Sequence, residues 1–236
     1  MRIGVALRRG VVAGVLAGLC AGLLALTIGE PPVEAAIQLE EAATAGQPGP
    51  PQFEVTRPAQ RVGLVVGTTL VGLAVGALFG VASAWAVGRV GGGVWARSLK
   101  LGATAVGVLV LLPALKYPPN PPAVGDPATI GRRTTLYLGL ALVGLLLALA
   151  AWAGARQLAT SRLPAPVRQA LVGAGVVAVA VVLLVALPAI GEEPDVPAGL
   201  LWSFRLASIA TQATLYGGTA LVFGLLVTRD ERRAST

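Results

Sequence analysis

The chain has 236 residues, of which 55% are hydrophobic and 12% are charged, and its mean hydropathy is +0.78. Soluble proteins carry roughly a quarter charged residues, so this composition indicates an integral membrane protein. The net charge of +7 does not indicate a nucleic-acid partner, because the basic residues lie between apolar runs and form no single soluble face. The chain has no histidine and one cysteine, Cys20, which excludes an intramolecular disulfide and leaves few nitrogen or sulfur ligands for a metal.

Six apolar runs are long enough to cross a membrane as helices, which requires about 20 residues each. The expected spans are residues 9–29, 61–87, 97–115, 133–154, 168–190 and 199–227. The first run is interpreted as an uncleaved helix, because its apolar part is long for a signal peptide. We therefore expect one polytopic membrane domain over residues 1–236, all-α, with six transmembrane helices. Segment 30–60 is expected to be an acidic, partly disordered outer loop, because it is rich in Pro, Ala, Gly and Glu.

Charged residues alternate between the two sides of the expected membrane. With six spans, most of the 18 basic residues fall on the side of the two termini, whereas Asp230 and Glu231 alone among the 11 acids do so. Lys and Arg accumulate on the cytoplasmic side of membrane proteins. Both termini are therefore expected to be cytoplasmic.

Glycines recur every four residues in the first expected span and follow a similar pattern in the second. The glycines expected to pack these helices are Gly10, Gly14, Gly18, Gly22, Gly72, Gly76 and Gly80, and Gly63 and Gly67 precede the second series. Small residues on one face let helix backbones approach closely in lipid. The alternative is that the pattern only reflects the abundance of glycine, which supplies 31 residues.

Acidic residues beside prolines are candidates for a divalent-cation site at the outer mouth. They are Glu30, Glu34, Asp126, Glu192, Glu193 and Asp195. Converging carboxylates raise the local concentration of cations and are ligands for hard divalent ions. Two alternatives stay open: these acids are solvated loop residues, or Arg61 and Lys116 at the same interface neutralise them.

The segment from Pro113 to Arg133 contains six prolines and separates the third and fourth expected spans. Proline fixes φ and lacks an N–H, so the run is predicted to be a stiff, extended outer loop without helix, with a turn near Gly125 and Asp126.

Polar residues of the sixth expected span are spaced by three and four and so share one helical face. They are Arg205, Ser208, Gln212, Tyr216 and Thr219. An arginine at the centre of a span costs about 2.5–3.5 kcal/mol on insertion scales, so Arg205 is expected to reach the interface or to pair with an acid. The face either lines a transport path or forms hydrogen bonds between helices.

Motifs along the chain resemble the CbtA family of predicted cobalt transporter subunits. The motifs are Pro113-Ala-Leu-Lys-Tyr-Pro-Pro-Asn-Pro-Pro-Ala-Val-Gly-Asp-Pro127, Ile130-Gly131-x-Arg133-Thr134, Leu136-Tyr137, Gly29-Glu30-Pro31, Arg61-x-Gly63-Leu64, Leu187-Pro188 and Phe204-Arg205-x-Ala207-Ser208. The composition, rich in alanine and valine, resembles that of a high-GC actinobacterial member. No Walker loop, His-Glu-x-x-His, Cys-x-x-Cys or nucleophile elbow occurs, so we do not expect an enzyme.

The resemblance implies a bacterial plasma-membrane protein that takes part in cobalt uptake beside a small, histidine-bearing CbtB-like membrane protein. We expect a permease or permease subunit for a divalent cation, with no permanently bound cofactor and transient binding of Co²⁺ or another divalent ion. Oxygen ligands alone discriminate poorly among such ions. Either a partner supplies nitrogen ligands, or the site is weak, or the substrate is not cobalt. The alternative is a non-transporting accessory subunit of a larger membrane complex.

Overall fold

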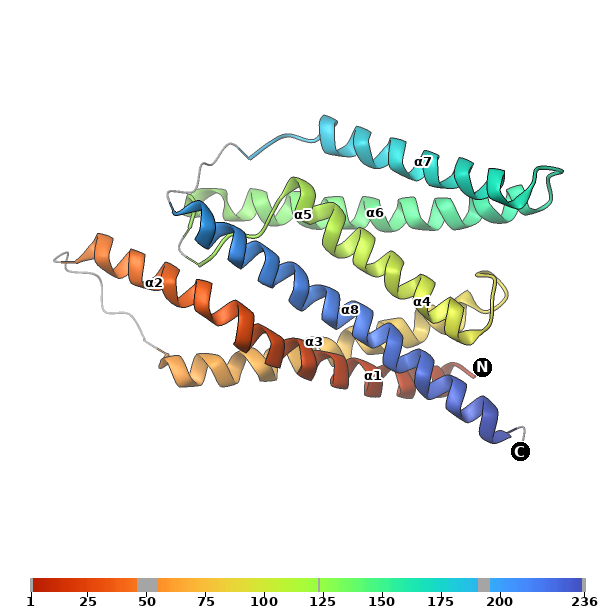
Figure 1. Cartoon of the computed structure of the whole chain (residues 1–236), viewed down its shortest axis with the longest axis horizontal. Coiled ribbons are helices and arrows are strands. Elements are labelled where there is room, and N and C mark those ends of the chain that lie inside the picture. Colours follow the sequence, from red (N-terminus) through yellow and green to blue (C-terminus); the bar gives the residue numbers. More distant parts are fainter. Residues whose placement is uncertain (1, 46–54, 123, 191–195, 235–236) are drawn as a thin grey trace.

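The structure is a computed structural model that describes residues 2–45, 55–122, 124–190 and 196–234. Within these residues the chain forms helices and no strand. Six helical segments are long and apolar enough to cross a membrane (Figure 1). They are Ile3–Thr44, Arg57–Ala86, Val94–Lys116, Ile130–Ala159, Ala165–Ala186 and Ala198–Asp230. This result confirms the predicted all-α fold with six transmembrane helices.

The first span is longer than predicted and includes part of the segment expected to be a loop. Helix α1 (Ile3–Leu24) continues through a π-helical turn, η1 (Ala25–Gly29), into helix α2 (Glu30–Thr44). Residues 30–44 are therefore helical, which corrects the expected start of the outer loop. The prolines Pro31 and Pro32 are tolerated because they lie in the first turn of α2. The Glu30 N–H bonds to the Ala25 carbonyl across the wider turn.

The third span uses the same combination of a π-helical turn and a proline. Helix α4 (Val94–Ala105) passes through η2 (Val106–Leu111) into the short helix α5 (Leu112–Lys116). Pro113 is thus helical, contrary to the prediction for the proline run, because it lies in the first turn of α5, where a missing N–H is tolerated. The described residues from Tyr117 to Asp126 form no helix. We call residues 117–126 the proline loop.

After the proline loop, a short 3₁₀ helix leads into three long helices. The elements are η3 (Pro127–Thr129), α6 (Ile130–Ala159), α7 (Ala165–Ala186) and α8 (Ala198–Ala234). Helix α8 packs against α1 and α4, whereas α6 and α7 pair with each other and contact the third span through η2 and α5 (Figure 1). Helix α7 is strongly apolar and buries none of its residues within this chain.

The tightest helix pair is α1 with α3 (Arg57–Ala86), which run antiparallel. A Cβ atom at Gly14 would overlap the carbonyl oxygen of Gly72, and one at Gly10 would overlap that of Gly76. All seven glycines assigned to packing lie in this contact, where Gly22 faces the side chain of Thr68. The structure shows no neighbouring atom within 4 Å of a Cβ built at Gly63 or Gly67.

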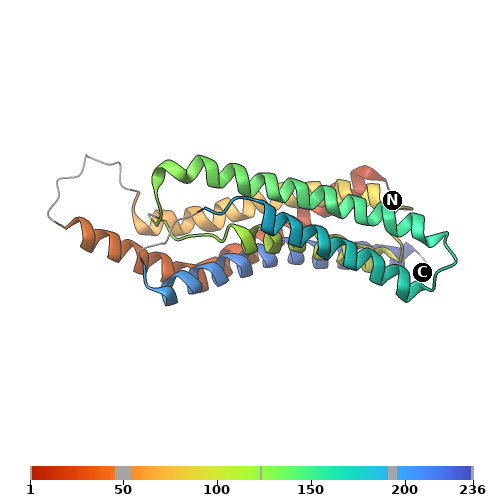
Figure 2. The ribbon, with the colours of Figure 1, turned by 90° about the horizontal axis from the view of Figure 1, so that it is seen from above.

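The two termini lie at one end of the bundle, and the proline loop lies at the other (Figures 1 and 2). We call these the terminal end and the distal end. At the terminal end, Arg9 of α1 forms an ion pair with Asp230 of α8. A cytoplasmic location of the terminal end remains a prediction from the charge pattern.

Candidate functional site

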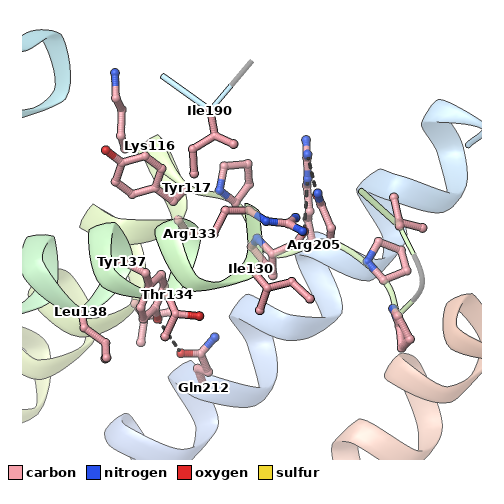
Figure 3. Close-up of a pocket in the computed structure, with 18 residues that line it drawn as sticks. Lys116, Tyr117, Ile130, Arg133, Thr134, Tyr137, Leu138, Ile190, Arg205 and Gln212 are labelled. Carbon is pink, nitrogen blue, oxygen red and sulfur yellow. Dashed lines mark hydrogen bonds between the residues drawn. The ribbon is translucent and has the colours of Figure 1, made fainter. Parts of the chain in front are cut away.

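The distal end contains a cavity of about 610 Å³ beneath the proline loop (Figure 3). Its walls come from the proline loop and from the adjoining parts of the third span, α6 and α8, with Ile190 from the segment that follows α7. Polar and charged groups in the wall are Lys116, Tyr117, Asn120, Arg133, Thr134, Tyr137, Arg205 and Gln212. The fold therefore brings together polar residues that lie far apart in the sequence.

Arg205 connects helix α8 to the proline loop. Its Nη2 atom donates a hydrogen bond to Oδ1 of Asn120 at 3.1 Å, and its Nε atom donates to the carbonyl oxygen of Pro119 at 3.4 Å. Its guanidinium also lies 5.8 Å from the ring centroid of Trp202, a distance typical of a cation–π contact. Because Arg205 is about two turns from the start of α8, these contacts hold its charge near the distal end.

Tyr137 joins α6 to both the third span and α8. Its hydroxyl donates to the carbonyl oxygen of Leu109 at 3.1 Å and lies 3.4 Å from Oε1 of Gln212 (Figure 3). Leu109 belongs to the π-helical turn η2, so the tyrosine reaches the point where the third span departs from regular α-helix. The irregular turn of this span is thus fixed by a side chain from another helix.

Tyr117 fixes the start of the proline loop. Its backbone N–H bonds to the carbonyl oxygen of Pro113 at 2.7 Å, and its buried side chain donates to the carbonyl oxygen of Pro188 at 3.0 Å. The second bond links the loop to the segment that leaves α7. The loop is therefore anchored by Tyr117 on one side and by Arg205 on the other.

The described part of the cavity wall carries three basic side chains. They are Lys116, Arg133 and Arg205, and none of the described lining residues is an acid. Among the described residues, no group of three or more Asp, Glu, Cys or His is placed to hold a metal ion.

The predicted cation ligands on α2 are occupied by ion pairs. Glu30 accepts hydrogen bonds from Arg57 at 2.9 Å and from Arg61 at 2.8 Å, through the same oxygen, and Glu34 accepts from Arg57 at 3.0 Å. Neutralisation by Arg61, one of the alternatives left open by the sequence, therefore occurs, and Arg57 is a second partner that the sequence analysis did not name. Both the acids and the arginines are spaced four residues apart, and this matched spacing is the signal that could have revealed the pairing.

Asp126, another predicted cation ligand, does not form a cluster with Glu30 and Glu34. Oδ1 of Asp126 accepts a 2.8 Å hydrogen bond from the Ala128 N–H at the start of η3, and Asp126 does not line the cavity. Glu192, Glu193 and Asp195 lie outside the described residues. The structure thus brings Glu30 and Glu34 together without Asp126.

The polar face predicted for the sixth span divides into two parts. Arg205 and Gln212 line the cavity, whereas Ser208 and Tyr216 are partly exposed elsewhere on α8. Thr219 is fully buried, and its hydroxyl donates to the carbonyl oxygen of Leu215 at 2.7 Å. Arg133, Thr134 and Tyr137 also line the cavity, and only the resemblance motifs had singled them out.

A family model described as "Probable cobalt transporter subunit (CbtA)" matches residues 4–228, which is nearly the whole chain. The chain belongs to the CbtA family. Comparisons with curated proteins and with solved structures gave no match. The description of the CbtA family and the six candidate membrane helices together support a multi-pass membrane protein in cobalt ion transport. A transporter subunit is a class of protein distinct from enzymes.

Proposed function

We propose that this CbtA protein is a permease subunit for a divalent cation and that the cation is cobalt. The proposal is carried by the family match over residues 4–228. It is supported by six apolar helices and by a cavity at the distal end that polar residues of α6 and α8 line. The positive-inside rule favours a distal end that faces away from the cytoplasm of a bacterial plasma membrane, with both termini cytoplasmic.

In this proposal, a partner supplies the strong metal ligands. The chain has no histidine, and Glu30 and Glu34 are paired with arginines. Co²⁺ favours imidazole and mixed nitrogen and oxygen sites. A small, histidine-bearing CbtB-like membrane protein would provide the missing nitrogen atoms, and Co²⁺ would bind this chain transiently.

The proposed route follows helix α8 from the distal end. Glu192, Glu193 and Asp195 precede α8 in the sequence and would raise the local cation concentration. Below Arg205, the side chains of Gln212 and Tyr137 offer neutral oxygen atoms. Ser208 lies between Arg205 and Gln212 on α8, and the route would continue beyond Gln212 along Tyr216 and Thr219.

Cobalt uptake by cells that produce the protein with its membrane partner tests this proposal. Gln212→Leu and Glu193→Gln are expected to lower the initial uptake rate several-fold, because each removes an oxygen ligand or a negative charge from the route. Gln157→Leu is the matched control, since Gln157 is exposed near the end of α6, away from the cavity. Wild-type uptake by both route variants would exclude the route, and uptake that does not depend on this chain would exclude the function.

A non-transporting accessory subunit is the second candidate, and the ion pairs of α2 with α3 favour it. Such pairs give Glu30 and Glu34 a structural role instead of a role in metal binding. Purification in mild detergent separates the two candidates. Stoichiometric recovery with subunits of another membrane enzyme, independent of added cobalt, would support the accessory role.

A further inference from the structure

We propose that an apolar cavity between the third span, α6 and α7 binds one anionic phospholipid. An acyl chain occupies this cavity, and Lys100, Arg156 and Arg168 bind the phosphate group at the terminal end. We call this space the intramembrane cavity. It shares no described lining residue with the cavity beneath the proline loop, and the proposal does not depend on cobalt transport.

The wall of the intramembrane cavity fits a hydrocarbon chain. The cavity has a volume of about 420 Å³, and its lining residues belong to membrane-spanning segments. Apart from Trp152, Thr104 is the one polar side chain among the described lining residues, and its hydroxyl donates to the Lys100 carbonyl oxygen at 2.8 Å. Apolar cavities do not hold ordered water. Leu111 and Leu115 in the wall are exposed, so acyl chains of the surrounding bilayer have access to the cavity.

The volume of the cavity distinguishes an acyl chain from the helix of a partner protein. A membrane helix is about 10 Å across and about 30 Å long, so it would need several times the volume of the cavity. A single acyl chain is much thinner than a helix. The size of the intramembrane cavity therefore favours lipid over the membrane span of another protein.

Basic residues continue the cavity-lining faces of α4 and α6 toward the terminal end. Lys100 precedes the lining residue Thr104 by four positions on α4, and Arg156 follows the lining residue Trp152 by four positions on α6. Residues four apart share one face of a helix. Both basic side chains are exposed. They are therefore placed to bind the headgroup of a lipid whose chain lies in the cavity.

Helix α7 follows the same pattern. Arg168 precedes the lining residue Val176 by eight positions, which places both on the face that packs toward the rest of the chain. Arg168 donates to the Ala159 carbonyl oxygen at 3.2 Å, and Lys100 donates to that of Gly91 at 2.8 Å. Both acceptors are uncharged, and a guanidinium or an ammonium group has further N–H donors for a phosphate.

The sequence itself makes this region basic. Residues 87–116 and 130–186, which include the three helices and their connections at the terminal end, contain no Asp or Glu. Asp230 and Glu231 lie at the terminal end on α8, which contributes no described lining residue, and Asp230 forms an ion pair with Arg9. Basic pockets between membrane helices bind anionic lipid headgroups. An anionic phospholipid therefore matches both the apolar wall and the charges beside it.

Quenching of Trp152 fluorescence by brominated acyl chains tests the site. The full-length protein carries Trp85→Phe, Trp95→Phe and Trp202→Phe, which leaves Trp152 as its only tryptophan, and is placed in phosphatidylcholine nanodiscs. A small fraction of the lipid is then replaced by brominated phosphatidylglycerol or brominated phosphatidylcholine. We expect saturable quenching by phosphatidylglycerol at a lipid fraction at least about fivefold lower than phosphatidylcholine requires, because each basic residue near a membrane surface adds about this factor for an anionic lipid.

Two glutamine variants test the phosphate ligands. Lys100→Gln and Arg156→Gln should each lower the preference for phosphatidylglycerol about fivefold. Arg229→Gln is the control, because it removes one positive charge at the terminal end from α8, which does not line the described cavity. The preference should be unchanged in this control.

A matched pair of substitutions on α7 tests the place of the acyl chain. Ala180→Phe puts a ring into the intramembrane cavity and should abolish the preference for phosphatidylglycerol, although all the basic residues remain. Ala178→Phe is the control, because Ala178 is exposed outside the cavity. If the variant with one tryptophan does not fold, native mass spectrometry of the otherwise unmodified protein compares binding of the two lipids in the same variants.

Two results would overturn the proposal. Equal quenching by the two brominated lipids would mean that bulk lipid or a partner helix occupies the cavity. A preference for phosphatidylglycerol that survives both glutamine variants and Ala180→Phe would place the bound lipid elsewhere on the protein.

Discussion

Arg205 on α8 donates a 3.1 Å hydrogen bond to the side-chain oxygen of Asn120, which lies 85 positions earlier in the proline loop. Together with the bond from Arg205 to the carbonyl oxygen of Pro119, this hydrogen bond ties the proline loop to helix α8 across the cavity. Arg205 is therefore one of the side chains that hold the loop over the cavity, beside Tyr117 and Arg133. This contact also explains how an arginine is tolerated within the sixth span.

Replacing Asn120 should loosen the proline loop. Asn120→Ala removes the acceptor of a charge-assisted bond, and we expect trypsin to cleave after Lys116, at the border of the loop, several-fold faster than in the parent protein. Asn120→Asp is the control, because it places a carboxylate opposite the guanidinium and should slow cleavage. Equal cleavage rates in all three proteins would show that this bond does not hold the loop.

Adding a methyl group at the contact of α1 with α3 should destabilise the protein. A Cβ at Gly14 or Gly76 would overlap backbone atoms of the facing helix, and overpacking of this kind typically costs about 1–3 kcal/mol. We expect Gly14→Ala and Gly76→Ala to lower the melting temperature in detergent.

The same helices provide matched controls for this experiment. Gly63 and Gly67 lie on α3, and no atom lies within 4 Å of a Cβ built at either position. Alanine there should be neutral or should stabilise the helix by about 0.5–1 kcal/mol, because glycine is a weak helix former. Equal destabilisation by all four substitutions would contradict an effect specific to the helix contact.

The six spans could be predicted from the sequence because length and apolarity alone identify a membrane helix. The helix boundaries at Pro31 and Pro113 could not be predicted in this way. The rule that proline ends a helix considers one residue, whereas in both spans a π-helical turn precedes the proline and places it in a new first turn. That arrangement depends on hydrogen bonds between backbone groups five residues apart, and the residue types alone do not reveal such bonds.

The candidate site was only partly predictable for a different reason. A sequence supplies the residue types but not their partners, so Glu30 and Glu34 resembled free metal ligands although Arg57 and Arg61 neutralise them. Arg205 and Gln212 were found by their helical spacing. Tyr137 was not, because its role depends on the packing of α6 against η2 and α8.

The ion pair between Glu30 and Arg57 should stabilise the contact of α2 with α3. The Glu30 side chain is 13% exposed and lies 2.9 Å from Arg57, so we expect a coupling of about 1 kcal/mol, at the upper end of values for exposed pairs. A double-mutant cycle with Glu30→Gln and Arg57→Gln, followed by reversible unfolding, measures this coupling. Glu40→Gln is the control because its side chain is exposed on the same helix. A coupling near zero would show that the pair is only a surface contact.

Removing the Tyr137 hydroxyl should destabilise the π-helical turn of the third span. Tyr137→Phe keeps the ring but deprives the Leu109 carbonyl of its 3.1 Å donor, which typically costs about 1 kcal/mol. Tyr216→Phe is the matched control: Tyr216 lies in the same membrane region, and the described structure shows no side-chain hydrogen bond for it. We expect faster hydrogen exchange around Leu109 in Tyr137→Phe and unchanged exchange in the control. The turn η2 lies where the packing partner of the third span changes from α8 to α6. Equal exchange in both variants would mean that backbone hydrogen bonds alone maintain this turn.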